Sequence, residues 1–286
     1  MRIAPAIFIV LLLLGGTLHA GSYSVRGEAL LDAAPPVIHP IPTAAYLGAC
    51  GKMEAVIPVE LVKTRIWRRR ITNIAMWLEP IESSGLESSS TSTTYETLKI
   101  NEDKCRFVPQ IAVVPIGTRI EIWNEDRKDH LLLVERENGK VEQYVQRYTE
   151  DPSAFTFDTP NTNIIPRGQP VVIKADRPGK ISIKSGMHRW MEGWIVVVKG
   201  PFIPAVPAKD GLFTLKDISG GEYRLHVWHP YLGENSGIVR LPEDNKKVIS
   251  ISYHGIPKQD EIPSTLVSTE KEINEEKDVW DDMDNW

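Results

Sequence analysis

Short runs of alternating polar and apolar residues recur along most of the chain, separated by glycine, proline and aspartate. The run Gly-Thr-Arg-Ile-Glu-Ile-Trp at 117–123 alternates with a period of two, as expected for a strand with one buried face. Residues 24–31 are predicted as an edge strand. Further strands are predicted where β-branched and aromatic residues cluster: 56–62, 71–78, 107–115, 171–175, 179–184, 194–199, 211–216, 222–228 and 248–253.

The segments between these runs have the composition of surface loops. The stretch 83–94 is rich in Ser and Thr, 160–170 begins and ends with proline, and 201–207 is Pro-rich and predicted as a linker. With 21 Pro and 20 Gly in 286 residues, short strands joined by turns favour β-sandwiches. The pattern predicts an all-β chain.

The N-terminus carries the features of a secretory signal. Arg2 precedes an apolar run at 3–14, and Leu18-His19-Ala20 ends in a small residue. A membrane anchor is the alternative, but the run is shorter than the roughly 20 residues that a span requires. We expect cleavage after Ala20, no transmembrane segment in the mature chain, and secretion across the inner membrane to a periplasmic or extracellular location.

The two cysteines, Cys50 and Cys105, agree with export, because a pair in an oxidising compartment predicts a disulfide. In the chain-entropy model such a bond contributes roughly 4 kcal/mol to stability. Two buried thiols are the alternative. Neither cysteine belongs to a Cys-x-x-Cys motif, which argues against a thiol redox motif or a zinc finger.

Charge is distributed unevenly. From Lys258 onward the chain has ten acidic residues and three lysines, whereas the whole chain has a net charge of −5. This acidic tail, at 257–286, is predicted to be disordered. The basic run Arg65-Ile-Trp-Arg-Arg-Arg70 is a single cluster in an exported protein, so we expect no nucleic-acid partner.

Two histidines lie in segments with other metal-ligand candidates. His130 closely follows a predicted strand, and the loop 185–194 contains His188 and Met191. Imidazole and thioether together suit copper, especially Cu(I), and suit Mg²⁺ or Ca²⁺ poorly. Without further context, structural histidines and a core methionine explain the same residues.

The segment from Cys105 to Val198 resembles the plastocyanin-like (cupredoxin) domain of exported bacterial proteins labelled methylamine utilisation protein. It supplies a Cys-x-Phe-x-Pro stretch, an Asn-x-Asp-x-x-x-His stretch and a His-x-x-Met-x-Gly stretch, which here are 105–109, 124–130 and 188–193. The resemblance implies a cupredoxin-like Greek-key β-sandwich. It also implies copper ligands at His130, His188 and Met191.

One position departs from that pattern. Ser185 stands where the family has its ligand cysteine, and a serine hydroxyl does not replace the copper–thiolate bond of a blue site. Two interpretations stay open: a degenerate, non-blue copper site with Ser185 or a water in the fourth position and Glu192 as an outside candidate, or a metal-free scaffold. The first implies a copper carrier or electron-transfer accessory that works with an envelope redox or copper-handling protein.

The segment 210–225 resembles the carboxypeptidase-regulatory or transthyretin-like β-sandwich module, with an Asp-Gly turn and a Gly-x-Tyr strand start. Residues 201–253 supply few strands for such a sandwich, so the region 25–81 is a candidate to complete it. The predicted organisation is a signal peptide at 1–20, a linker or edge strand at 21–46, an N-terminal β segment at 47–100, the cupredoxin-like domain at 101–200, the second sandwich at 201–256, and the tail.

Two further possibilities are disfavoured. His226 and His229 lie three apart on a predicted strand and therefore point to opposite faces, so a second metal site there is not expected. No nucleophile elbow or His-Glu-x-x-His motif is present, and a Ser-x-x-His step alone does not make a hydrolase. We expect a protein that is not an enzyme.

Overall fold

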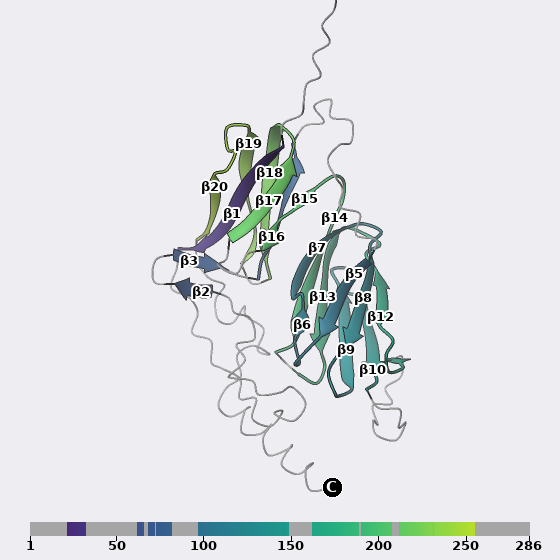
Figure 1. Cartoon of the computed structure of the whole chain (residues 1–286). Helices are drawn as coiled ribbons and strands as arrows, with labels where there is room; N and C mark the ends of the chain where they lie inside the picture. The colour runs from purple at the N-terminus through teal and green to yellow at the C-terminus, as the bar shows by residue number, and fades with distance from the viewer. Residues whose placement is uncertain are drawn as a thin grey trace, which may run out of the picture.

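The computed structural model describes residues 22–32, 62–65, 68–71, 73–81, 97–148, 162–188, 190–207, 212–230 and 232–254. All regular elements in these ranges are strands (Figure 1). Their bounds are β1 (Tyr23–Leu31), β2 (Val62–Arg65), β3 (Arg68–Ile71), β4 (Ala75–Pro80), β5 (Thr97–Glu102), β6 (Phe107–Val108), β7 (Ile111–Pro115), β8 (Arg119–Asn124), β9 (His130–Arg136), β10 (Val141–Gln146), β11 (Thr162–Ile165), β12 (Val171–Lys174), β13 (Gly179–Ser185), β14 (Glu192–Val198), β15 (Ile203–Pro204), β16 (Val206–Pro207), β17 (Leu212–Ile218), β18 (Gly221–His229), β19 (Gly233–Leu241) and β20 (Val248–Tyr253). The predicted all-β class is confirmed.

Strands β5 to β14 form one sandwich, which we call the inserted sandwich. Its larger sheet has the order β11-β10-β9-β13-β14-β7, and its smaller sheet has the order β12-β8-β5-β6. Every second side chain of a strand points to the same face, and these side chains form the core between the two sheets. Ile120 and Ile122 on β8 are fully buried, as are Leu132 and Val134 on β9. The two pairs come from opposite sheets, so their inward faces close one apolar layer.

The remaining strands form a second sandwich, the flanking sandwich, from both ends of the described chain. One sheet has the order β16-β17-β1-β3-β2, with β20 also paired to β1, and the other has the order β15-β4-β18-β19. Strand β1 pairs antiparallel with β17 and parallel with β20, while β4 pairs with β18. The inserted sandwich therefore lies, in sequence, between two halves of the flanking one (Figure 1).

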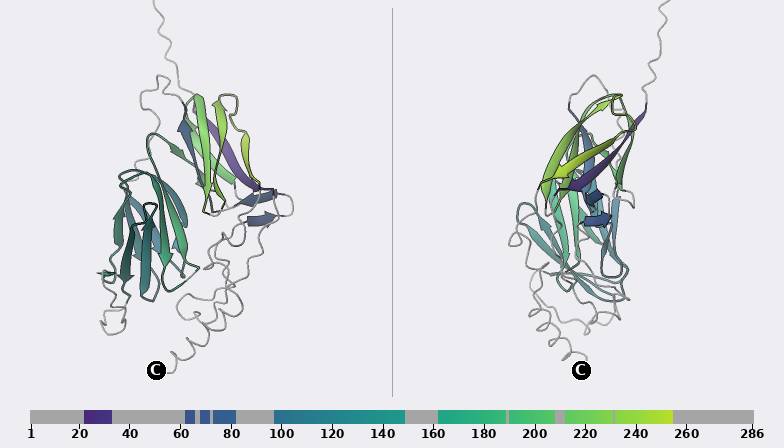
Figure 2. Two further views of the ribbon diagram at one scale, coloured as in Figure 1. Left: turned by 180° about the vertical axis from the view of Figure 1, so that it is seen from behind. Right: turned by 90° about the vertical axis from the view of Figure 1, so that its left-hand side faces the viewer.

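A third apolar cluster joins the two sandwiches. Trp77 and Trp228 from the flanking sandwich pack with Val196 and Val198 of β14 and with Phe202 on the connection between them. Trp194 meets Trp228 edge to face, with ring centroids 5.4 Å apart. The left view of Figure 2 shows the two sandwiches next to each other.

Several predicted boundaries change in the structure. Strand β1 is not an edge strand, because it has neighbours on both sides. The predicted strand 107–115 is two strands, β6 and β7, which pair in different sheets. The predicted linker 201–207 contains β15 and β16, and the predicted loop 160–170 contains β11.

Some predictions lie outside the described residues. They include the signal peptide 1–20, Cys50, most of the predicted strand 56–62, the loop 83–94 and the acidic tail 257–286. The predicted Cys50–Cys105 pairing accordingly stays a prediction. Within the described ranges, no helix is long and apolar enough to cross a membrane.

Candidate metal centre

Antiparallel pairing brings the two predicted histidine segments to one end of the inserted sandwich. His130 is the first residue of β9, and Ser185, the last of β13, lies opposite Leu132 in the register of the same sheet. The loop that follows Ser185 therefore returns beside the start of β9. The His130 and His188 rings lie 5.2 Å apart between centroids, tilted by 49°, so the structure places both side chains together.

One edge of the His130 ring is held by a carboxylate. Its Nε2 lies 3.0 Å from Asp126 Oδ2, and Asn124 Oδ1 accepts a hydrogen bond from the Asp126 amide. Burial alone would lower the pKa of His130, but the Asp126 hydrogen bond and the Glu102 charge outweigh it and raise that pKa. His130 Nδ1 is buried and has no hydrogen-bond partner within the described ranges.

The loop 185–191 is closed by its own backbone. Met191 N donates to His188 O at 2.9 Å, and Ser185 N donates to Met191 O at 3.0 Å. Gly186 N donates to Leu131 O at 2.7 Å, and a Cβ added at Gly186 would lie 2.6 Å from Leu131 Cδ2. A side chain at 186 would therefore require the Leu131 side chain to move.

The second histidine lies inside this loop. His188 is 1% exposed, and its Nδ1 lies 3.5 Å from Ser185 Oγ. Trp190 meets the His188 ring edge to face at 5.1 Å. Burial first, and then the charges of His130 and Lys128, lower the pKa of His188 to about 3. The imidazole is therefore neutral near pH 7, which is the form that binds metals.

Ser185 occupies a position built for an electron-rich atom. Its Oγ accepts hydrogen bonds from the backbone amides of Met187, at 3.2 Å, and His188, at 3.0 Å. These donors stabilise negative charge on whatever atom they surround. The hydroxyl itself is neutral and supplies no thiolate.

Met191 is buried at 1% exposure, in the same core cluster as Trp190. Its backbone closes the loop that carries His188. Glu192, the outside candidate, has its Oε1 3.9 Å from Lys184 Nζ. That contact gives Glu192 an electrostatic partner on the neighbouring strand.

A buried carboxyl group that interacts with His130 was not predicted. Glu102 ends β5 and is 0% exposed, and neither of its carboxylate oxygens has a hydrogen-bond partner among the residues described. Burial raises the pKa of Glu102 to about 7, against the lowering effect of the His130 charge. Its register was a usable signal, because Leu98, Ile100 and Glu102 fall on one face of a strand and a glutamate thus occupies a core position.

Cys105, which was predicted only as a disulfide partner, lies close to the histidines. Its Sγ is 3.8 Å from His188 Nε2, and ligand atoms of Cys105, Asp126 and His130 lie within 4.8 Å of one another. In the part of the chain that the structure describes, this is the only group of three such residues able to hold a metal ion.

Within the described ranges, His226, His229 and Arg70 of the basic run lie away from this site. His226 stacks on Trp77 at 4.8 Å and lies between Glu79 and Glu234, at 2.8 and 3.2 Å. His229 is fully buried, and burial lowers its pKa to about 3. Arg70, from the basic run, pairs with Glu28 at 2.7 Å.

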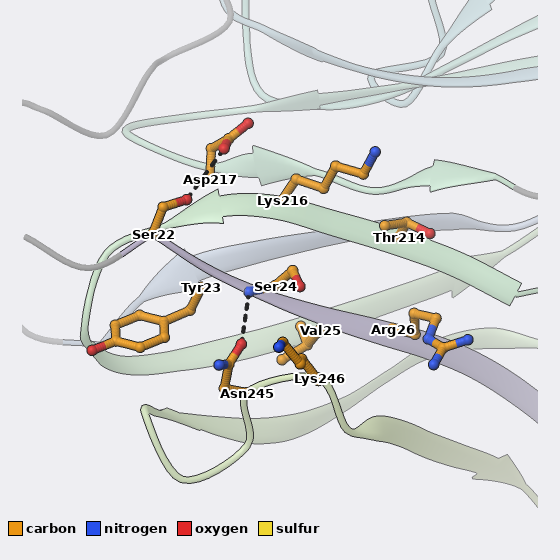
Figure 3. Close-up of a pocket in the computed structure, with 10 residues that line it drawn as sticks. All are labelled: Ser22, Tyr23, Ser24, Val25, Arg26, Thr214, Lys216, Asp217, Asn245 and Lys246. Atoms are coloured by element: carbon orange, nitrogen blue, oxygen red, sulfur yellow. Dashed lines mark hydrogen bonds between the residues drawn. The ribbon is translucent and has the colours of Figure 1, made fainter.

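A surface pocket of about 570 Å³ lies on the flanking sandwich, between β1, β17 and the turn before β20 (Figure 3). Hydrogen bonds from Ser22 Oγ to Asp217 and from Ser24 N to Asn245 lie within it, each 3.2 Å long. Arg26, Lys216 and Lys246 contribute positive charge to its lining. No predicted site residue lines this pocket.

Comparison with known proteins gives structural matches only. No family model and no curated protein matches the sequence. Among solved structures, the chain resembles a copper-containing nitrite reductase from Thermus scotoductus, with 21% identity over 43% of this chain and 26% of that one and a TM-score of 0.27. It also resembles a purple cupredoxin from Nitrosopumilus maritimus (19% identity, 35% and 98% covered, TM-score 0.24) and amicyanin from Paracoccus versutus (10%, 42% and 92%, 0.24).

At these identities and TM-scores, the matches are a resemblance to part of the chain. The predicted methylamine-utilisation family and the transthyretin-like module stay predictions.

The donor set fits copper in part. His130 combines a carboxylate on Nε2 with an unpartnered, buried Nδ1, which is the arrangement of a metal-ligating histidine whose second nitrogen is held by an outer carboxylate. A second neutral imidazole lies beside it, and a thioether residue closes the same loop. A thiolate at position 185 is missing, so the set does not fit a blue centre.

Proposed function

We propose that this chain is an exported, non-catalytic cupredoxin-like protein that binds copper at a non-blue site formed by His130, His188 and Met191. Ser185 or a water fills the fourth position. The observation that carries this proposal is the buried Nδ1 of His130, which has no hydrogen-bond partner among the described residues while Asp126 holds the opposite nitrogen. A buried polar atom without a partner costs free energy unless a ligand occupies it.

The chain's own residues prepare this site before any ion binds. Asp126 fixes the orientation of the His130 ring, and the low pKa of His188 keeps its imidazole neutral. The closed loop keeps His188 and Met191 buried. When bound, copper would supply a one-electron redox couple, and the neutral donors His, His and Met favour its Cu(I) form.

A role as a copper carrier or redox accessory follows from this ligand set. Its partner would be an envelope redox or copper-handling protein. The competing proposal, a metal-free scaffold, is supported by the missing thiolate at Ser185.

The decisive experiment is copper binding by the mature chain. Purified protein is loaded with Cu(I) under ascorbate and with Cu(II), and stoichiometry is measured by elemental analysis together with competition against a chromophoric chelator. We expect one copper per chain, with tighter Cu(I) than Cu(II) binding. The His130→Ala and His188→Ala variants are expected to lose it.

His226→Ala is the matched control, because His226 has a carboxylate on each nitrogen and lies on the other sandwich. It is expected to bind copper as the wild type does. Copper-free protein after loading, or equal losses in all three folded variants, would favour the scaffold.

A further inference from the structure

The copper proposal uses the Nδ1 edges of the two histidines, and a second set of donors surrounds the opposite edges. His188 Nε2 lies 3.8 Å from Cys105 Sγ, and His130 Nε2 lies 3.0 Å from Asp126 Oδ2. Cys105, Asp126 and His130 offer ligand atoms within 4.8 Å of one another. All four residues are buried, with exposures from 0% to 6%.

The fold holds these four donors firmly. The amides of Lys104 and Cys105 both donate to the Asp126 carboxylate, at 2.6 and 2.9 Å, so the cysteine segment is tied to the loop before His130. Trp190 Nε1 donates to Cys105 O at 3.1 Å, which ties the same segment to the His188 loop. These hydrogen bonds link the chain segments that carry Cys105, Asp126 and His188.

The donor types are those of a zinc site. Zn²⁺ binds thiolate, imidazole and carboxylate in a tetrahedron. With metal–ligand bonds of about 2.0 to 2.3 Å, a tetrahedral zinc site places neighbouring donor atoms roughly 3.5 Å apart. The 3.8 Å separation of Cys105 Sγ from His188 Nε2 and the 3.0 Å separation of His130 Nε2 from Asp126 Oδ2 lie on either side of this value. A thiolate and a carboxylate also neutralise the double charge of the ion.

The surroundings add a buried carboxyl group whose oxygens a bound cation would satisfy. Both carboxylate oxygens of the fully buried Glu102 have no hydrogen-bond partner in the described ranges, and its charge acts on both His130 and Asp126. This feature is independent of the cysteine. It indicates that the site is incomplete without a positive ion.

Cys105 is not a free cysteine in the structure. In the predicted disulfide with Cys50 its sulfur carries no charge and is not a thiolate ligand. We propose that Cys105, Asp126, His130 and His188 form a Zn²⁺ site that opens when this disulfide is reduced. A redox change would thereby decide which metal the two histidines hold.

Reduction of the disulfide converts Cys105 into a thiol that can bind zinc as a thiolate. A thiol or phosphine reductant supplies two electrons and is oxidised to a disulfide or a phosphine oxide, the Cys50–Cys105 bond breaks, and both sulfurs become thiols with two protons taken from the reducing thiols or from water. On zinc binding, the Cys105 thiol releases its proton to solvent. The ion displaces the proton that His130 Nε2 shares with Asp126, and the ring then carries one proton on Nδ1, so that it binds as a neutral imidazole.

The test compares two variants that both lack the disulfide. Cys50→Ala leaves Cys105 as a permanent thiol, and the double variant Cys50→Ala with Cys105→Ser removes that thiol and nothing else. We expect Cys50→Ala to bind one Zn²⁺ per chain at least 100-fold more tightly than the double variant, by competition with a chromophoric chelator. With Co²⁺ as the probe, only Cys50→Ala should show thiolate-to-cobalt charge-transfer absorption.

The wild-type chain gives the same comparison without a substitution. Zinc binding is expected after reduction by a phosphine and absent before it, with circular dichroism confirming that the reduced chain stays folded. Equal zinc affinity in the two variants, or no zinc on the reduced folded chain, would overturn the proposal.

This outcome is separable from the copper proposal. Met191→Leu is expected to weaken Cu(I) binding and to leave zinc binding by the Cys50→Ala chain unchanged, because the thioether is not in the zinc set. The double cysteine variant is expected to lose tight zinc binding and to keep Cu(I) binding.

Discussion

Two glutamates in this chain are almost equally buried but differ in their hydrogen-bond partners. Glu28, in the flanking sandwich, is 1% exposed, and its carboxylate accepts hydrogen bonds from Arg70 Nε and Ser250 Oγ, both at 2.7 Å. Glu102, in the inserted sandwich, is 0% exposed, and neither oxygen has a hydrogen-bond partner among the described residues.

The difference separates a supporting region from a binding region. In the flanking sandwich a buried charge joins three strands, β1, β3 and β20, and is neutralised where it lies. In the inserted sandwich, the unpartnered atoms of Glu102 and His130 gather at one end of the fold. Buried polar groups without partners are rare because they destabilise the folded state. A cluster of such groups therefore indicates a site at which a bound ligand satisfies them.

The largest expected effect is the loss of the Glu28 partner. Arg70→Ala leaves a buried carboxylate without its counter-ion, and breaking such a pair costs about 3 kcal/mol or more. We expect the free energy of unfolding, measured by urea titration with circular dichroism, to fall by that amount. Copper and zinc binding by the folded fraction should be unchanged.

Lys180→Ala is the control for this variant. Its Nζ lies 3.7 Å from Glu137 and 4.0 Å from Glu234 in partly exposed pairs, and pairs near the surface contribute about 1 kcal/mol or less. If the two variants lose the same stability, the flanking sandwich does not depend on its buried pair.

The second prediction concerns Glu102 in the metal-free chain. Its pKa of about 7 in the folded state exceeds the unfolded value, so the folded state holds a proton between about pH 4.5 and 7 that the unfolded state has released. Stability must then fall as pH rises through this window, by about 1.4 kcal/mol per unit and about 3 kcal/mol in total. Above pH 7 this contribution is constant.

Glu102→Gln removes that titration. We expect the difference in unfolding free energy between variant and wild type to grow in the variant's favour from pH 4.5 to 7 and then level off. His188 and His229 titrate in both proteins and cancel in the difference. A difference that is flat across the window would show that Glu102 is not held as a buried, unpaired acid.

The proximity of His130 and His188 could be predicted from the sequence because their signal is local. His130 follows an alternating strand, and His188 lies in a short loop between two strands, so antiparallel pairing was enough to bring them to one end of the sheet. Strands β5, β9, β10 and β19 were not predicted, and the last of them has the weakest pattern. Strand β19 is Gly-Glu-Asn-Ser-Gly-Ile-Val-Arg-Leu, in which polar residues and glycine conceal the alternation.

The rest of the site depends on contacts between distant segments. Glu102 and Cys105 reach the histidines through the pairing of β5 with β8, which joins opposite sides of a turn-rich segment. Spacing along the chain carries no information on which nitrogen of each ring faces which donor. The second donor set therefore required three-dimensional coordinates.

The smallest expected change in free energy tests whether the end of the inserted sandwich is a copper site with one ligand altered. In Ser185→Cys, the amides of Met187 and His188 that now bond to Oγ would stabilise a thiolate in the same place. With His130 and His188 beside it, we expect an intense visible charge-transfer band with Cu(II) and at least tenfold tighter binding, a change of about 1.4 kcal/mol.

Ser182→Cys is the matched control, because Ser182 is also buried and lies three residues earlier on the same strand, β13. A thiol there is not at the loop that carries His188, so this variant should remain colourless. Absorption spectra and thiol counts of both variants, taken after copper loading, separate the outcomes. A colourless, folded Ser185→Cys protein would mean that the two histidines do not share a metal through their Nδ1 edges, and the unpartnered nitrogen of His130 would then need another occupant.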